Sequence, residues 1–197
     1  MAKRKPSGPA IFMYCVIALT VILSALCFTL YYTGFTDSVA VLWTGITAFT
    51  VMYHFWVRII LGNVTKLFRI DYRQRWFREH KFEKKLYGFL RVREWRDKVL
   101  TYNPDSFLME KNSLEQIANT MAKAETDHWI NEIVSVTTMF FPLLWGAFPI
   151  FFITALAAML FDAQFILVQR HNRPKVVRLI EWKKKKSNKI EYTGNIS

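Results

Sequence analysis

Long apolar runs separated by short polar stretches dominate the pattern along this chain of 197 residues. Residues 10–32 carry no charge, and residues 38–61 are interrupted only by His54 and Arg58. Because about 20 apolar residues in a helix cross the hydrocarbon core of a bilayer, each run predicts one membrane helix. The short link between the two runs predicts a tight connection.

A third apolar run covers residues 133–169, and its only charged residue is Asp162. The run is too long for one membrane helix and short for two. Pro142, Gly146 and Pro149 lie near its middle, which is typical of the turn of a helical hairpin. We therefore expect helices at about 129–145 and 147–169, the first of them short or re-entrant.

These runs predict an all-α integral membrane protein, with about four transmembrane helices in a single membrane domain over residues 1–197. Residues 62–128 mix aromatic and basic side chains, which is typical of amphipathic helices at a membrane surface. Within this segment Ser113 and Gln116 form a capping-box pattern that predicts the start of a helix. The polar tail 181–197 is expected to be disordered.

The positive charges predict which side of the membrane the polar segments occupy. Of the 27 Lys and Arg residues, three precede the first run, fifteen lie from Arg58 to Lys123 inclusive, and nine lie from Arg170 onward. The positive-inside rule then places both termini and the 62–128 segment in the cytoplasm. The basic side chains that give the net charge of +12 would contact anionic membrane lipid. Because membrane topology and lipid contact explain this charge, we do not expect a nucleic-acid partner.

Polar residues fall at helical spacing on three of the predicted helices, one stripe on each. Two of the stripes lie at similar predicted depths, since His54 and Asp162 are each seven residues from the cytoplasmic end of a run. A charged residue inside a membrane helix carries a large free-energy cost and marks a functional site by default. These stripes predict a polar pocket in the cytoplasmic leaflet, lined by His54, Glu125, His128, Asp162, Gln169 and Arg173.

The residue types in this pocket suit acyl transfer to an alcohol. A histidine beside a carboxylate can take a proton from a hydroxyl, arginines can hold phosphates, and a side-chain amide can orient a carbonyl. The chain has no His-x-x-x-x-Asp pattern and no Gly-x-Ser-x-Gly elbow. Two acid–histidine pairs at helical spacing, His80 with Glu83 and Glu125 with His128, are too common a pattern to predict a metal, and no bound cofactor is expected.

Four stretches of the sequence carry a family resemblance, in order and at similar spacing: Lys-Phe-Glu-Lys at 81–84, residues 92–100, Ala-Glu-Thr-Asp-His-Trp at 124–129, and Val-Gln-Arg-His-Asn-Arg-Pro at 168–174. In these stretches the chain resembles the glycosyl-4,4'-diaponeurosporenoate acyltransferases, small bacterial membrane proteins of carotenoid biosynthesis. The resemblance covers residues 81–179. It implies transfer of a fatty acyl group to a sugar hydroxyl of a glycosylated carotenoid or similar glycolipid in the bacterial cell membrane.

The resemblance selects most of the candidate site residues, whereas His54 and Asp162 come from the polar stripes, and the roles are inferred from the chemistry of the side chains. We expect His128 to be the general base, Glu125 its orienting carboxylate, and Asp162 a further catalytic acid. The expected partners are the lipid-linked sugar acceptor and an acyl donor such as acyl-CoA, as co-substrate. The expected substrate-binding residues are His54, Arg93, Trp95, Lys98, Gln169, Arg170, Asn172 and Arg173.

Two other functions fit the same sequence. A non-catalytic membrane scaffold or accessory protein would use its basic face to bind anionic lipid or a partner protein. A transporter would use Asp162 and His54 as a proton relay, but four short helices without an internal repeat disfavour it. The oligomeric state and the chain length of the acyl group stay open.

Overall fold

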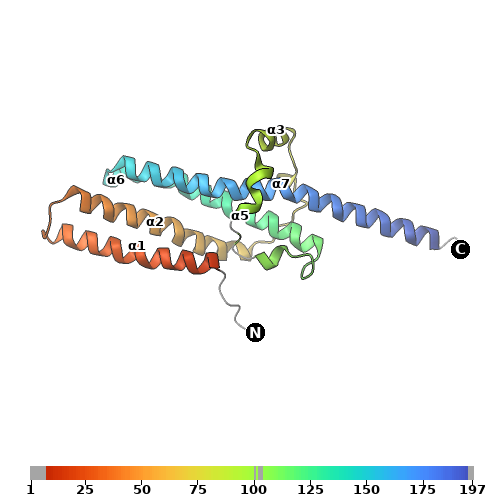
Figure 1. The fold of residues 1–197 in the computed structure, drawn as a ribbon, viewed down its shortest axis with the longest axis horizontal. Helices are drawn as coiled ribbons and strands as arrows, with labels where there is room; N and C mark the ends of the chain where they lie inside the picture. The colour runs from red at the N-terminus through yellow and green to blue at the C-terminus, as the bar shows by residue number, and fades with distance from the viewer. Residues whose placement is uncertain (1–7, 100, 102–103, 195–197) are drawn as a thin grey trace. The chain divides into compact units, whose positions relative to one another are not determined.

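The computed structural model describes residues 8–99, 101 and 104–194, and every regular element in this part of the chain is helical. Two long helices, α1 (Gly8–Tyr32) and α2 (Val39–Val64), form an antiparallel pair at the N-terminal end (Figure 1). The turn between them contains Gly34 with a positive φ of 75°. Both apolar runs therefore form single helices, and their bounds lie within three residues of the predicted ones.

Shorter elements follow in the basic segment. They include α3 (Lys81–Phe89), α4 (Val92–Trp95) and single 3-10 turns at Thr65–Leu67, Arg75–Phe77, Arg96–Lys98 and Pro104–Phe107. Helix α5 (Leu114–Thr138) begins at the predicted capping box. Here the Ser113 backbone N–H donates to the side chain of Gln116 at 2.8 Å, and the Gln116 N–H donates to the Ser113 hydroxyl at 3.2 Å. These two bonds satisfy amides that a helix leaves without partners at its start.

The third apolar run forms a helical hairpin, as expected, but its helices have other bounds than the predicted 129–145 and 147–169. Helix α5 ends at Thr138, a four-residue helix α6 (Pro142–Trp145) follows, and α7 (Phe148–Gly194) starts after Gly146 and Ala147, which both have positive φ. Proline fits at the first position of a helix, where its missing N–H is not needed. This accounts for the start of α6 at Pro142.

Helix α7 continues far beyond the predicted end of its apolar part. It includes Pro174 and extends through the tail expected to be disordered as far as Gly194. The expectation of a disordered tail is therefore wrong for the described part of the tail, residues 181–194. Adding a residue to an existing helix forms a hydrogen bond without a new nucleation cost, and the lysines of this stretch are good helix formers.

Among the described residues, three helices are long and apolar enough to cross a membrane, where four were expected: α1, α2 and the Phe148–Lys189 part of α7. Their surfaces fit that environment, because Phe12, Leu19 and Ile22 on α1 and Leu160 on α7 are each more than 60% exposed. Exposed apolar surface of this extent marks contact with a membrane or a partner. Helix α5 is not one of them, and it carries four charged residues from Lys123 to Glu132.

The chain divides into two compact units. Unit 1 contains Met1–Phe68, Leu100–Tyr102 and Asp127–Ala163, and unit 2 contains Arg69–Val99, Asn103–Thr126 and Gln164–Ser197. In unit 1, Gly45 of α2 packs closely on α1, because a Cβ atom at this position would lie 3.0 Å from the Cβ of Cys27. Small residues allow such close approach between membrane helices.

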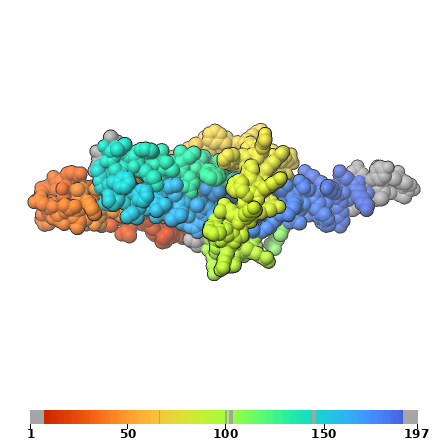
Figure 2. Space-filling view, turned by 90° about the horizontal axis from the view of Figure 1, so that it is seen from above, coloured from red at the N-terminus to blue at the C-terminus, as the bar shows by residue number. Residues whose placement is uncertain are grey.

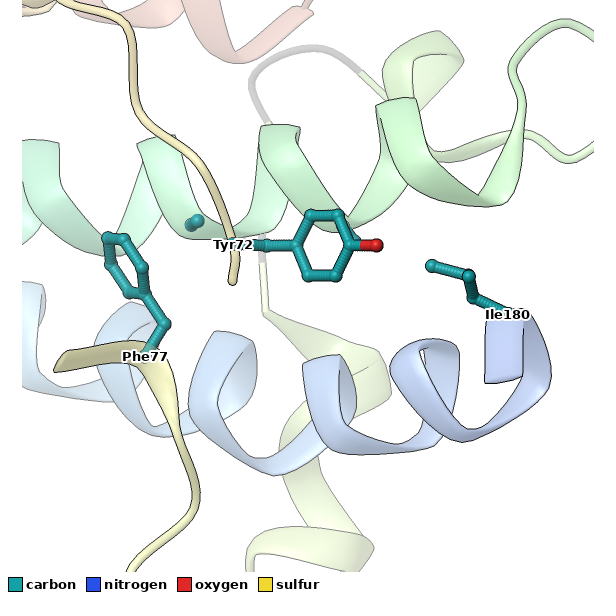
Figure 3. Packing of buried hydrophobic residues seen from close by; sticks show 5 residues of the cluster. Tyr72, Phe77 and Ile180 are labelled. Carbon is teal, nitrogen blue, oxygen red and sulfur yellow. The ribbon is translucent and has the colours of Figure 1, made fainter. Parts of the chain in front are cut away.

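Unit 2 has its own apolar core, in which Tyr72, Phe77 and Ile180 meet the two small residues Ala118 and Ala122 of α5 (Figure 3). The extended segment before α3 is thereby held between parts of α5 and α7. A hydrogen bond from the Tyr72 backbone N–H to the Asn119 side chain, at 3.0 Å, adds to this contact. In Figure 2 the segment Arg69–Val99, in yellow to yellow-green, covers part of the surface of α7.

Candidate functional site

A buried cluster in unit 1 centres on the carboxylate of Asp162, whose side chain is fully inaccessible to solvent. Arg58 of α2 donates to one of its oxygens and forms an ion pair with it. His128 of α5 contacts the other oxygen, with Nδ1 2.7 Å from Oδ1. Asn131, one turn further along α5, donates to the same oxygen at 3.3 Å. Two helices, α2 and α5, thus contribute side chains to a single acid on a third helix, α7.

The position of Arg58 differs from that of most arginines near the end of a membrane helix. An arginine near the end of a membrane helix ordinarily extends its charged group to the lipid headgroups. Instead, the guanidinium donates to the backbone carbonyls of His54, at 2.7 Å, and Ala158, at 3.4 Å, besides its ion pair with Asp162. It also lies 5.8 Å from the centre of the Phe161 ring. The buried acid makes this arrangement favourable, because an unpaired charge there would be costly.

His54 lies one turn before Arg58 on α2 and is 5% exposed. Its Nε2 is buried and has no hydrogen-bond partner among the described residues. Buried polar atoms nearly always have partners, so an exception requires an explanation. The structure places His54 in the polar interior of unit 1, as the sequence stripe predicts, next to the Arg58–Asp162 pair.

The cluster has the composition of a general base with its orienting carboxylate. A carboxylate on Nδ1 fixes the ring orientation and stabilises the imidazolium that forms when Nε2 takes a proton. Asp162 is fully buried, whereas the His128 side chain is 21% exposed. The acid is therefore shielded from water while the imidazole reaches the surface of the unit.

The carboxylate that contacts His128 belongs to Asp162, whereas the sequence predicted that Glu125 would make this contact. Both oxygens of Glu125 accept from arginines instead: Oε1 from Arg170 at 2.6 Å, and Oε2 from Arg173. Glu125 is fully buried within unit 2. An orienting role for Glu125 is therefore wrong, because its two oxygens are engaged by two guanidinium groups.

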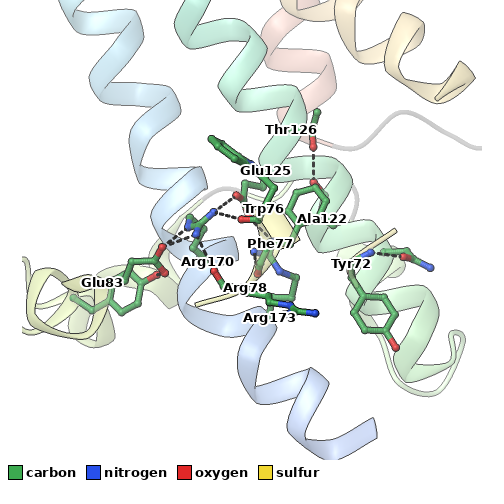
Figure 4. A network of polar contacts seen from close by, with 12 residues as sticks. Tyr72, Trp76, Phe77, Arg78, Glu83, Ala122, Glu125, Thr126, Arg170 and Arg173 are labelled. Carbon is green, nitrogen blue, oxygen red and sulfur yellow. Dashed lines mark hydrogen bonds and ion pairs between the residues drawn. The ribbon is translucent and has the colours of Figure 1, made fainter. Parts of the chain in front are cut away.

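This second network, in unit 2, joins two acids and two arginines (Figure 4). Arg170 donates to Glu83 through Nε at 3.0 Å, in addition to its bond with Glu125. All four side chains are at most 10% exposed. Two negative and two positive charges cancel, which allows the whole group to be buried.

The same arginines hold the backbone of the segment before α3. Arg170 donates to the carbonyls of Trp76 and Arg78, each at 3.3 Å, and Arg173 donates to the carbonyl of Phe77 at 2.7 Å. The guanidinium of Arg173 also lies 4.8 Å from the centre of the Phe77 ring. Arg170 and Arg173 were expected to bind substrate, but these contacts occupy them inside the fold.

Tyr87 of α3 completes the network by donating to Glu83 at 2.9 Å. Burial raises the pKa of the Tyr87 phenol well above its usual range, and the hydrogen bond to Glu83 raises it further. The phenol therefore remains a neutral donor at every physiological pH. Its ring meets that of His171 edge-on, with the ring centres 5.1 Å apart.

The other expected substrate-binding residues lie in unit 2 and are more accessible. Arg93 and Lys98 are exposed, and Gln169 is half-buried. Trp95 donates its indole N–H to the Leu90 carbonyl at 2.8 Å. Asn172 accepts from Arg96 at 2.8 Å. The structure does not test whether any of them contacts a substrate.

The sequence did not predict several residues that form hydrogen bonds in these clusters: Asn131, Glu83, Tyr87 and Arg96. Asn131 could have been found, because it follows His128 by three residues and therefore lies on the same helix face. The pairing of Glu83 with Arg170 spans 87 positions and has no local signature. Within the described part of the chain, no three His, Cys, Asp or Glu side chains gather in a way that could hold a metal ion.

Comparison with known proteins identifies one family. Residues 73–182, more than half of the chain, match the family model described as glycosyl-4,4'-diaponeurosporenoate acyltransferase. The match confirms the resemblance carried by residues 81–179 and extends it in both directions. No curated protein and no solved structure matches the chain.

Proposed function

The chain belongs to the glycosyl-4,4'-diaponeurosporenoate acyltransferase family, and we propose that it transfers a fatty acyl group to a sugar hydroxyl of a glycosylated carotenoid or similar glycolipid. The observation that carries this proposal is the contact between His128 and Asp162. In the proposed reaction the acceptor sugar lies at the membrane surface while its apolar part stays in the bilayer. The three apolar helices support this membrane location.

His128 is the proposed general base. Its Nε2 takes the proton from the sugar hydroxyl as the hydroxyl oxygen attacks the acyl carbonyl carbon of the donor. The bond between that carbon and the donor's leaving atom then breaks, and the imidazolium returns its proton to the leaving group. Such positioned proton transfer contributes roughly 10²–10⁴-fold to a rate.

Asp162 is the proposed orienting carboxylate, with Arg58 and Asn131 as positioning residues that act through it. Arg58 forms an ion pair with Asp162, and a carboxylate beside the imidazole stabilises the imidazolium that forms. The second bond, from Asn131, fixes the rotation of the carboxylate. This division of roles replaces Glu125 by Asp162 as the partner of the base.

We place both termini and the basic segment in the cytoplasm, on the strength of the Lys and Arg distribution. On that side an acyl donor made in the cytoplasm can reach His128 directly.

Lipid mass spectrometry of host cells tests the reaction class. A deletion strain is complemented with the wild-type gene, with His128→Ala, or with His80→Ala, a matched control because His80 is exposed. The proposal expects an acylated glycolipid in the wild-type and His80→Ala strains, and its loss in the deletion and His128→Ala strains. An unchanged lipid profile in the deletion strain, under conditions where the protein is produced, would overturn the proposal and favour a scaffold.

A further inference from the structure

Basic side chains gather in unit 2 where the α4 region contacts α7. Arg93 and Arg96 come from residues 92–98, and Lys175 and Arg178 come from α7. The positive charges of Arg93, Arg96 and Arg178 all act on the ammonium of Lys175. The carboxylate of Asp97 also acts on this ammonium, with the opposite sign. Three cations therefore lie near enough to Lys175 to act on its charge, against one carboxylate.

Specific contacts hold these cations together. Arg91, between α3 and α4, has a left-handed backbone with φ 49°, which is rare for a residue other than glycine. The turn places Val92 completely inside the unit. Arg96 then reaches α7, where its Nη1 donates to the Asn172 side chain at 2.8 Å. A fold that uses a strained turn to bring like charges together favours a functional explanation.

The cluster has unused donor capacity. The Nε of Arg96 is buried and has no hydrogen-bond partner within the described residues, although it forms an ion pair with the exposed carboxylate of Asp97 at 3.4 Å. Arg93, Lys175 and Arg178 are exposed. The ammonium of Lys175 lies 2.8 Å from Nε2 of His171, within hydrogen-bond distance. In contrast, buried acids occupy the guanidinium groups of Arg170 and Arg173.

We infer that Arg93, Arg96, Lys175 and Arg178 form a binding site for a ligand that carries clustered phosphates. Guanidinium groups bind phosphate oxygens in pairs and an ammonium adds a compact charge. The phosphates can belong to the nucleotide part of a coenzyme A donor or to an anionic lipid headgroup. The identity of the ligand as acyl donor rests on the proposed function, whereas the phosphate site itself does not.

Binding measurements on the full chain in neutral detergent test this inference. The probes are coenzyme A, inorganic phosphate, and the soluble short-chain lipids dihexanoyl phosphatidylglycerol and dihexanoyl phosphatidylcholine. The variants are Arg96→Gln/Lys175→Gln and Arg93→Gln/Arg178→Gln. The matched control, Lys183→Gln/Lys184→Gln, removes two exposed charges further along α7. Circular dichroism checks that each variant keeps its helix content.

The expected result is that both variant pairs weaken coenzyme A binding at least about tenfold, equivalent to ~1.4 kcal/mol, while the control stays within about twofold. The same loss for phosphatidylglycerol alone would support the site and identify a lipid headgroup as its ligand. Equal affinities of variants and control for every probe would overturn the inference. His128→Ala separates the two proposals, because it should abolish acyl transfer and leave coenzyme A binding unchanged.

Discussion

The imidazole of His128 lies 2.7 Å from the carboxylate of Asp162, although 34 residues separate them in the chain. The contact connects α5 to α7 within unit 1, and Arg58 of α2 reaches the same carboxylate. Removing any one of these side chains therefore affects both the proposed chemistry and the packing of three helices.

Asp162→Asn is expected to destabilise unit 1 by about 3–5 kcal/mol, because it leaves the Arg58 charge buried without its partner. Thermal unfolding in detergent, followed by circular dichroism, measures the loss. The control is Asp37→Asn in the exposed turn after α1. Adding Arg58→Met to Asp162→Asn should recover part of the stability, and an Asp162→Asn variant as stable as the wild type would contradict the ion pair.

Glu125→Gln is expected to release the segment before α3. Glu125 neutralises both arginines that hold the carbonyls of residues 76–78, and without it they lose their anchor. Limited trypsin digestion should then cut after Arg75 and Arg78 at least about tenfold faster, because cleavage follows the population of the open segment. Glu110→Gln, at an exposed site, is the matched control, and equal cleavage rates in the two variants would exclude the anchoring role.

The Tyr87 phenol provides a pH test of the same network. Its pKa is raised in the folded state by burial and by Glu83, so its contribution to stability is complete below the unfolded value of about 10 and is lost as pH rises above it. Spectroscopic titration of phenolate should show one ionisation fewer than expected near pH 10. If the wild-type and Tyr87→Phe titrations differed by a full phenol in that range, the raised pKa would be refuted.

Gly45→Leu is expected to destabilise the α1–α2 pair by about 1–3 kcal/mol, the usual cost of overpacking. A side chain at Gly45 would meet the Cβ of Cys27 and the ring of Phe28 at 3.0 Å, whereas a Cβ at Gly62 meets nothing within 4 Å. Gly62→Leu on the same helix is thus the control, and its better helix propensity should leave stability unchanged or raised. The midpoints of thermal unfolding of the two variants measure this difference in stability. Equal midpoints would contradict close packing at Gly45.

The helices could be predicted from the sequence more fully than the side-chain partners. Local signals placed α1 and α2, and the capping box at Ser113 marked the start of α5, because each depends on neighbouring residues. The continuous α7 was missed, since its charged second half resembles a polar tail. The contact of Arg58 with Asp162 spans 104 positions, and only the packing of α2 against α7 within unit 1 reveals it.

The same limit explains the exchange of roles between the two acids. Glu125 is three residues from His128, so helical spacing favoured it as the orienting carboxylate. That spacing could not reveal that Arg170 and Arg173 take both of its oxygens. Asp162 was singled out by its position in an apolar run, but nothing local indicated which histidine it would contact.

The most direct test of the central claim is the rate of acyl transfer in isolated membranes by His128→Gln, which keeps a polar side chain of similar size. The account predicts a rate lower by about 10²–10⁴-fold, the usual contribution of a positioned general base, with the protein still inserted and helical. A rate equal to that of the wild type would contradict the assignment of His128 as the base and, with it, the function proposed for the His128–Asp162 contact.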